Sequence, residues 1–164
     1  MYRFVVLSAL LATAAVAEDV ARQRTSAGVG ELPISFEIEG CSSSPCALPQ
    51  LEDAVVNVKF NAPHDSGSLR ARLVIFLLNI PFVFDLGADS DACRGLHASC
   101  PVKEGQELQY TLKLPIEAYI PIGTSVSLEI SVVDDSSSAA FCARVPVQVV
   151  APRNDNADAV QIIN

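Results

Sequence analysis

Basic and aromatic side chains are both scarce in this chain. Its 164 residues include 11 lysines and arginines against 19 acidic residues, which gives a formal net charge of −8, and there is no tryptophan. A nucleic-acid-binding surface needs a basic stripe that displaces counterions from phosphates, so nucleic acid is excluded as a partner. The acidic balance also opposes stable attachment to an anionic membrane surface, and we expect membrane contact to be transient at most.

The chain has no apolar run of the roughly 20 residues that a membrane-spanning helix takes. The first run, Phe4–Leu11, follows Arg3 and precedes the small-residue site Ala15-Val16-Ala17. This is the pattern of a secretory signal peptide, which we assign to residues 1–17. The second run, Leu73–Phe84, is short and interrupted, and we interpret it as a buried strand followed by a turn.

The remainder has the length of one domain. We assign residues 18–150 to that domain and residues 151–164 to a polar C-terminal tail. The chain lacks an Asn-x-Ser/Thr sequon, so N-glycosylation of the kind that accompanies lysosomal delivery is not expected. The protein is therefore predicted to be secreted and extracellular, with the lysosomal lumen as the alternative.

Helical periodicity is absent after the signal, and alternation of apolar with polar residues takes its place. Such a period of two is typical of strands with one solvated face. It covers five segments: 34–38, 54–60, 108–114, 126–132 and 145–149. Clusters of Ser, Pro, Gly and Asp separate them and predict turns. Many short strands at this spacing predict an all-β antiparallel sandwich or barrel.

The five cysteines form two close pairs and a single residue. Cys41 and Cys46 flank one turn-forming loop, Cys93 and Cys100 flank another, and Cys142 stands alone. In an exported chain this spacing predicts a disulfide framework, whereas zinc sites use repeated CxxC spacing, which is missing here. Pairing within each loop is the simplest arrangement, although the sequence leaves the connectivity open. Each such loop would stabilise the fold by about 2 kcal/mol.

Groups for catalysis are few. His64 and His97 have no nucleophilic partner in the sequence, and we expect both to lie in solvated loops. The acidic pairs at 89/91 and 134/135 are not followed by a calcium-binding loop, and in turns such residues usually cap and solvate the backbone. Phosphate-binding glycine motifs are missing as well. We therefore predict a protein that is not an enzyme and has no cofactor or metal.

Four segments together resemble the ML lipid-recognition family, most closely its Niemann–Pick C type 2 sterol carriers. They read EGCSSSPCAL (39–48), IPFVF (80–84), DACRGLHASCPVKEGQELQYTLKLPIEAYIP (91–121) and FCARVPVQVV (141–150). The resemblance covers residues 26–150. It implies an immunoglobulin-like β-sandwich of about seven antiparallel strands, stapled by disulfides, whose sheets enclose an apolar cavity for one ligand.

The resemblance also implies which residues contact a lipid. Phe84 matches a pocket phenylalanine of the family, Ile116 a valine near the pocket mouth, and Ile120 a position often held by tyrosine. Tyr119 would replace Ile120 if the local register shifted by one residue. Ordinary core packing would select the same residue types as a pocket lining at Phe84 and Ile116. The expected contacts are Phe84, Tyr110, Ile116, Tyr119, Ile120, Pro121 and Ile130.

The chain departs from the family pattern at several positions. A cysteine that usually pairs with the last one is replaced near Ser26, which implies that Cys142 is unpaired within the chain while the other four cysteines form disulfides. Ile130 and Ala143 stand where vertebrate members have tryptophan. Smaller side chains there would reshape the cavity, so that a bulky lipid other than cholesterol becomes plausible.

Three functions stay open at this point. The first, which we favour, is a monomeric carrier of a sterol or another hydrophobic small molecule, with a receptor or a membrane sterol transporter as an open further partner. The second is an immune-recognition module for microbial glycolipids, for which Arg70, Arg72 and Arg94 are the candidate rim cations. The third is a structural or adhesion sandwich with a filled core.

Overall fold

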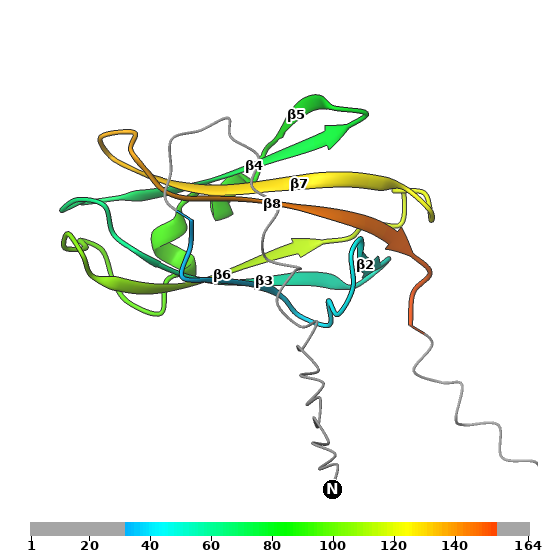
Figure 1. The fold of residues 1–164 in the computed structure, drawn as a ribbon, viewed down its shortest axis with the longest axis horizontal. Coiled ribbons are helices and arrows are strands. Elements are labelled where there is room, and N and C mark those ends of the chain that lie inside the picture. The colour runs from blue at the N-terminus through cyan, green and yellow to red at the C-terminus, as the bar shows by residue number, and fades with distance from the viewer. Residues whose placement is uncertain (1–31, 154–164) are drawn as a thin grey trace, which may run out of the picture.

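The computed structural model describes residues 32–153, which form two β-sheets stacked face to face (Figure 1). The smaller sheet has the order β1–β3–β6, with β1 at Ser35–Ile38, β3 at Asp53–Asn61 and β6 at Glu107–Pro115. The larger sheet has the order β2–β8–β7–β4–β5. Its strands are β2 (Cys46–Pro49), β4 (Leu69–Leu77), β5 (Ile80–Phe84), β7 (Ser125–Asp134) and β8 (Ala139–Val150). The predicted all-β, immunoglobulin-like sandwich is confirmed.

Helical structure in this part of the chain is limited to two 3-10 turns, η1 (Gly87–Ser90) and η2 (Ala92–Gly95), which follow β5. No helix among residues 32–153 is long and apolar enough to span a bilayer. The predicted signal peptide, the Ser26 position and almost all of the predicted C-terminal tail lie outside the described residues.

The core lies between the sheets and consists of the alternating apolar residues found in the sequence. Burial alternates along β3, β6 and β7, since every second side chain points to the facing sheet. At one end of the sandwich the rings of Phe60 and Phe141 meet across the sheets with their centroids 5.0 Å apart. Leu69 and Leu108 are buried at the same end. This end is filled by side chains from both layers.

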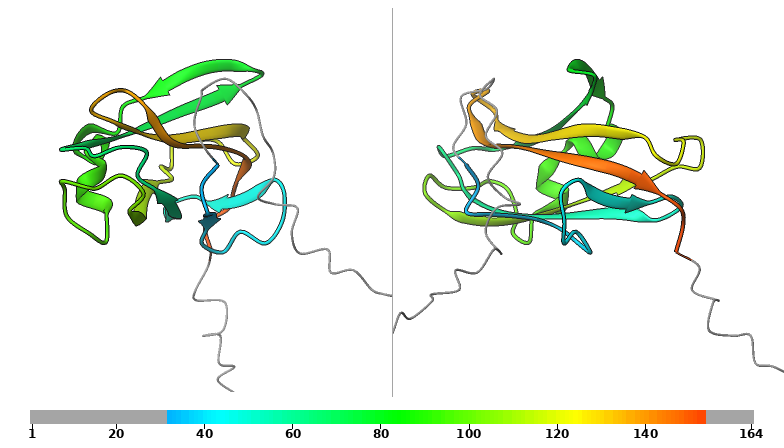
Figure 2. Two further views of the ribbon diagram at one scale, coloured as in Figure 1. Left: turned by 60° about the vertical axis from the view of Figure 1, so that its left-hand side comes forward. Right: turned by 45° about the vertical axis from the view of Figure 1, so that its right-hand side comes forward.

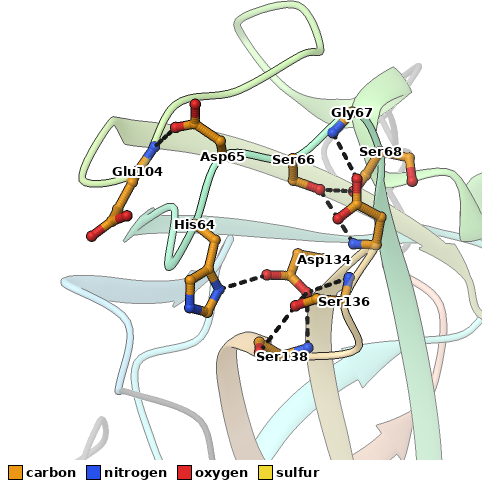
Figure 3. Close-up of polar contacts among 10 residues, drawn as sticks. His64, Asp65, Ser66, Gly67, Ser68, Glu104, Asp134, Ser136 and Ser138 are labelled. Atoms are coloured by element: carbon orange, nitrogen blue, oxygen red, sulfur yellow. Dashed lines mark hydrogen bonds and ion pairs between the residues drawn. The ribbon is translucent and has the colours of Figure 1, made fainter.

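Polar contacts tie the loops together at this same end (Figure 3). The Asp134 side chain is fully buried, and its Oδ2 accepts a hydrogen bond of 3.0 Å from His64 Nδ1 in the β3–β4 loop. Its Oδ1 accepts hydrogen bonds from the backbone amides of Ser136 and Ser138 and from the Ser136 hydroxyl. We call this end, with Phe60, Phe141 and the His64–Asp134 contact, the clasped end.

The number of strands and the direction of one strand differ from expectation. The described residues contain eight strands rather than about seven, and β2 pairs with β8 in parallel. No period-two signal marks β2 in the sequence, because the strand is four residues long and follows the Ser-Pro cluster of the first cysteine loop. The chain changes sheet between β1 and β2, so β2 becomes an edge strand beside the end of β8.

The disulfides join neighbouring cysteines. Cys41, which follows β1, pairs with Cys46, the first residue of β2. Cys93, within η2, pairs with Cys100. Cys142 is a free, half-buried thiol on β8. Burial, with the nearby Glu129 carboxylate, raises the pKa of the Cys142 thiol, which keeps it protonated and unreactive.

Candidate ligand-binding site

The larger sheet extends beyond the smaller one on the β5 side. β6 is the last strand of the smaller sheet, and β5 makes its main contacts with β4 alone. Figures 1 and 2 show the β4–β5 hairpin leaning away from β3 and β6. A face of β5 that would point into the core of a sandwich with equal sheets is therefore left uncovered.

The pairing register identifies the residues on that face. Residues directly opposite each other in an antiparallel pair point to the same side of the sheet. Leu73, which is buried in the core, is opposite Phe84, and the next inward pairs are Ile75 with Phe82 and Leu77 with Ile80. We call the surface formed by Ile75, Leu77, Ile80, Phe82 and Phe84 the overhang.

Exposure rises steadily from the core to the tip of the hairpin. Along β4 the inward residues pass from 3% exposed at Leu73, through a half-buried Ile75, to 43% at Leu77. On β5, Phe84, Phe82 and Ile80 are 43%, 52% and 57% exposed. A contiguous exposed apolar surface of this kind marks an interaction or ligand site in a soluble protein.

The opposite, outward face of β4 is covered at Phe76, close to the tip of the hairpin. The Arg144 guanidinium lies 3.6 Å from the centre of the Phe76 ring, a cation–π arrangement. Arg144 also forms an ion pair of 2.6 Å with Glu129. Val83, on the outward face of β5, is 74% exposed, so β5 presents apolar side chains on both of its faces.

The loop after β6 contains four of the expected lipid contacts, Ile116, Tyr119, Ile120 and Pro121. Ile116 donates its amide hydrogen to Glu52 O and accepts a hydrogen bond from Leu51 N, which fixes the loop against the β2–β3 turn. The Gln50 side chain donates to the carbonyl oxygens of Ala118 and Ile120. The loop is therefore held by hydrogen bonds to Gln50, Leu51 and Glu52.

The structure separates the expected lipid contacts into three groups. Tyr110, Ile116 and Ile130 are buried in the core, and Ile120 is half-buried against it. Phe84 lies on the overhang. Tyr119 is 77% exposed and Pro121 is exposed as well. At the position where two registers were considered, Ile120 rather than Tyr119 packs against the core.

Sequence reasoning missed most of the overhang. The run Leu73–Phe84 was interpreted as a buried strand and a turn, but it forms a hairpin in which every residue of β5 is exposed, so that prediction was wrong about burial. No alternation of apolar and polar residues marks the overhang in the sequence, because Pro81 and Val83 between Ile80, Phe82 and Phe84 are apolar as well.

The remaining candidates do not gather at this site. Arg70 and Arg72 are exposed on β4, and Arg94 lies on η2. His64 contacts Asp134 at the clasped end. Within residues 32–153 no three His, Cys, Asp or Glu side chains come together as a metal site.

Comparison with known proteins agrees with this architecture. The model of the ML domain (E1_DerP2_DerF2) matches residues 25–149. The chain belongs to the ML-domain family. It is 29% identical over 139 residues to NPC intracellular cholesterol transporter 2 of Sus scrofa, covering 85% of this chain and 91% of the relative. It is 30% identical over 117 residues to the protein of the same name from Danio rerio, covering 71% and 76%.

A solved ML-domain structure shows the same fold. The crystal structure of a Niemann-Pick type C2 protein from the Japanese carpenter ant superposes with a TM-score of 0.66 at 21% sequence identity, over 73% of this chain and 94% of that chain. The match to the ML-domain model takes in all eight described strands and therefore the whole overhang.

Proposed function

We propose that this ML domain is a secreted carrier that binds a sterol or another bulky apolar lipid between the overhang and the Ile116 end of β6. The observation that carries the proposal is the uncovered inward face of β5, where Ile80, Phe82 and Phe84 are 43–57% exposed. The names of the relatives, cholesterol transporters, support a sterol as the ligand class.

The energetics suit a carrier. A lipid that buries about 500 Å² of apolar surface gains roughly 12 kcal/mol before costs are counted. Association and ordering cost on the order of 4–15 kcal/mol. The difference allows binding that is useful and still reversible, as delivery from one membrane or protein to another requires.

The lining of the site supports binding without chemistry. The overhang is made of aliphatic and aromatic side chains, which offer no group for proton transfer or nucleophilic attack. We infer that the protein holds its ligand unchanged and uses no cofactor. The signal-like residues 1–17 and the two disulfides support secretion, and we propose that the carrier acts as a monomer whose further partner is a receptor or a membrane sterol transporter.

Titration of the purified protein with a fluorescent sterol tests the proposal. Phe84→Ala removes an inward side chain, and the neighbouring Val83→Ala removes an outward one that is 74% exposed. Because burying a phenylalanine against a ligand is worth about 1.5–3 kcal/mol, Phe84→Ala should weaken binding by about 10- to 100-fold. Val83→Ala should leave the Kd unchanged.

Two results would count against the carrier. One is the lack of saturable sterol or fatty-acid binding by the wild-type protein. The other is an equal loss of affinity in Phe84→Ala and Val83→Ala, which would place the ligand away from the overhang.

A further inference from the structure

The outward face of the larger sheet carries a contact among three residues that joins three neighbouring strands (Figure 1). Arg144 on β8 reaches across β7 to Phe76 on β4, where its guanidinium lies 3.6 Å from the centre of the ring. Glu129 on β7 lies between them. Its Oε2 accepts a hydrogen bond of 3.0 Å from Arg144 Nε and another of 2.6 Å from Arg144 Nη2. We call Phe76, Glu129 and Arg144 the clamp.

The clamp is partly shielded from solvent. The side chains of Arg144 and Glu129 are 19% and 14% exposed, whereas those of the surface pair Lys103 and Asp65 are 76% and 61% exposed. Surface ion pairs contribute little to stability. A guanidinium that is fixed by a carboxylate and stacked on a ring in drier surroundings is held more firmly. The clamp therefore has a defined geometry.

The clamp lies at the point where β4 leaves β7. The pairing of β4 with β7 ends with Phe76 opposite Ser127, and the next residue, Leu77, is paired only with Ile80 of β5. Since β5 in turn has only β4 beside it, no other strand supports the hairpin beyond Phe76. The direction in which the hairpin leaves the sheet is therefore set at Phe76, which Arg144 holds from the outside.

The neighbours of Phe76 in the chain belong to the overhang. Successive side chains of a strand point to opposite faces of the sheet, so Phe76 points outward while Ile75 and Leu77 point inward. Ile75 is opposite Phe82 and Leu77 is opposite Ile80. A rotation or bend of β4 at Phe76 moves these four inward side chains together. A contact on the outward face of the sheet thus controls the position of the apolar surface on its inward face.

The position of the hairpin determines the width of the proposed lipid site. The other side of that site, the Ile116 end of β6, is fixed by backbone hydrogen bonds with Leu51 and Glu52. A rigid, flat molecule such as a sterol needs the two sides at one separation, whereas a flexible acyl chain adapts to several separations. Holding one side of a site in its binding position favours the rigid ligand, because less ordering remains to be done on binding.

We propose that Arg144 is a positioning residue, which holds the β4–β5 hairpin through Phe76 and makes the lipid site selective for a rigid polycyclic ligand over a flexible acyl chain. The proposal rests on the lipid-carrier function and adds a residue that decides which class of lipid is preferred. Arg144 pairs with Glu129 on the outward face, so it acts on the ligand only through the hairpin.

The test measures the Kd of a fluorescent sterol and of a fluorescent fatty acid on the full chain. Arg144→Gln removes the guanidinium from both of its partners. It should weaken sterol binding by about fivefold, which is the strength expected of one partly shielded cation–π contact. Fatty-acid binding should change by less than about twofold, since the acyl chain adapts to a displaced hairpin. The ratio of the two Kd values is therefore the quantity that reports positioning.

Hydrogen exchange reads the hairpin in the absence of any ligand. In Arg144→Gln the amide hydrogens of the segment Leu73–Phe84 should exchange about fivefold faster, because loss of the clamp raises the population of the locally opened hairpin. Exchange in β3 and β6, which belong to the other sheet, should stay as in the wild type. Thermal melting verifies that each variant is folded.

Matched variants separate the clamp from net charge. Arg72→Gln removes the same charge from the same outward face, but Arg72 is exposed and lies four residues before Phe76, so neither the Kd ratio nor the exchange should change. Arg144→Lys keeps the charge without the planar group and should give intermediate values. Phe76→Leu should reproduce the effect of Arg144→Gln, and the double variant should show little further change.

The outcomes separate this proposal from the carrier function. Equal losses of affinity for the two ligands, or unchanged exchange in the hairpin, overturn the positioning role and leave the carrier standing. The same effects in Arg72→Gln overturn it as well, because they would then be effects of net charge. Full additivity of Phe76→Leu and Arg144→Gln shows that Arg144 does not act through Phe76. Failure of the wild type to bind either ligand saturably overturns the carrier function and the selectivity with it.

Discussion

The clasped end and the overhang are built from the same kinds of side chain and have opposite surroundings. At the clasped end, Phe141 is completely buried and meets Phe60 across the sheets. On the overhang, Phe84 is 43% exposed and has no strand of the smaller sheet opposite it. Aromatic residues thus stabilise the fold where two strands face each other and remain available to a ligand where only one sheet is present.

Replacing one phenylalanine at each place gives the largest contrast. Phe141→Ala leaves a cavity in a filled core and should lower the free energy of unfolding by about 3–5 kcal/mol. Phe84→Ala should cost less than about 1 kcal/mol, as is usual for a surface position. Urea unfolding followed by far-UV circular dichroism measures both, and comparable losses would show that β5 is part of the folding core.

The buried carboxylate gives the clasped end a pH dependence that the overhang lacks. Burial alone would raise the pKa of Asp134, but hydrogen bonds from Ser136, His64 and Ser138 hold it below its ordinary value of 3.8. A depressed carboxyl pKa contributes stability that is fully present above the unfolded value and is lost as the pH falls through the folded value.

Asp134→Asn should therefore lower the free energy of unfolding by about 2 kcal/mol at pH 7, since it replaces hydrogen bonds to a charged acceptor. The difference from the wild type should shrink below pH 4, where the unfolded carboxyl takes up a proton. Urea titrations at pH 7 and at low pH measure this difference, and sterol binding at pH 7 should stay unchanged. A constant difference across the pH range would mean that Asp134 acts only through its shape.

A substitution at the tip of the hairpin should give the smallest change in the free energy of unfolding, and this change should be a gain in stability. Leu78 has a φ of 51° and is 86% exposed, and Asn79 beside it has a φ of 66°. Side chains other than glycine, asparagine and aspartate adopt this left-handed conformation at a cost, so Leu78→Asn should raise the free energy of unfolding by about 0.5–1 kcal/mol.

Thermal melting measures the gain from Leu78→Asn. The neighbouring Leu77→Asn serves as its control, because Leu77 has an ordinary strand conformation and points into the overhang. Leu77→Asn should not gain stability and should weaken lipid binding. A gain in both variants would indicate relief of exposed apolar surface rather than relief of backbone strain.

The sequence predicted the strands that have one solvated face and one buried face. The alternation in segments 54–60, 108–114 and 126–132 reports burial directly, and these segments are the central parts of β3, β6 and β7. β5 gave no such signal because Pro81 and Val83 on its outward face are as apolar as its inward residues. A strand with two apolar faces is indistinguishable from a buried one.

The candidate site could be predicted only in part, for the same reason. Phe84 and Ile116 were identified through the family resemblance, and the structure places Phe84 on the overhang and Ile116 in the neighbouring loop. The polar recess lined by Asp89, Arg94, Tyr110 and Lys113 was not foreseen, because only the contact of η2 with β6 brings Lys113 close to the η1–η2 segment.

The sequence by itself determined the all-β class, the two short cysteine loops and the membership of the ML-domain family, since alternation, spacing and local motifs are properties of neighbouring residues. Only the tertiary structure decided which apolar surface remains uncovered. That outcome depends on the pairing of β4 with β7 and on the difference in width between the two sheets. Such pairings join residues far apart in the chain, and no local pattern records how far one sheet extends past the other.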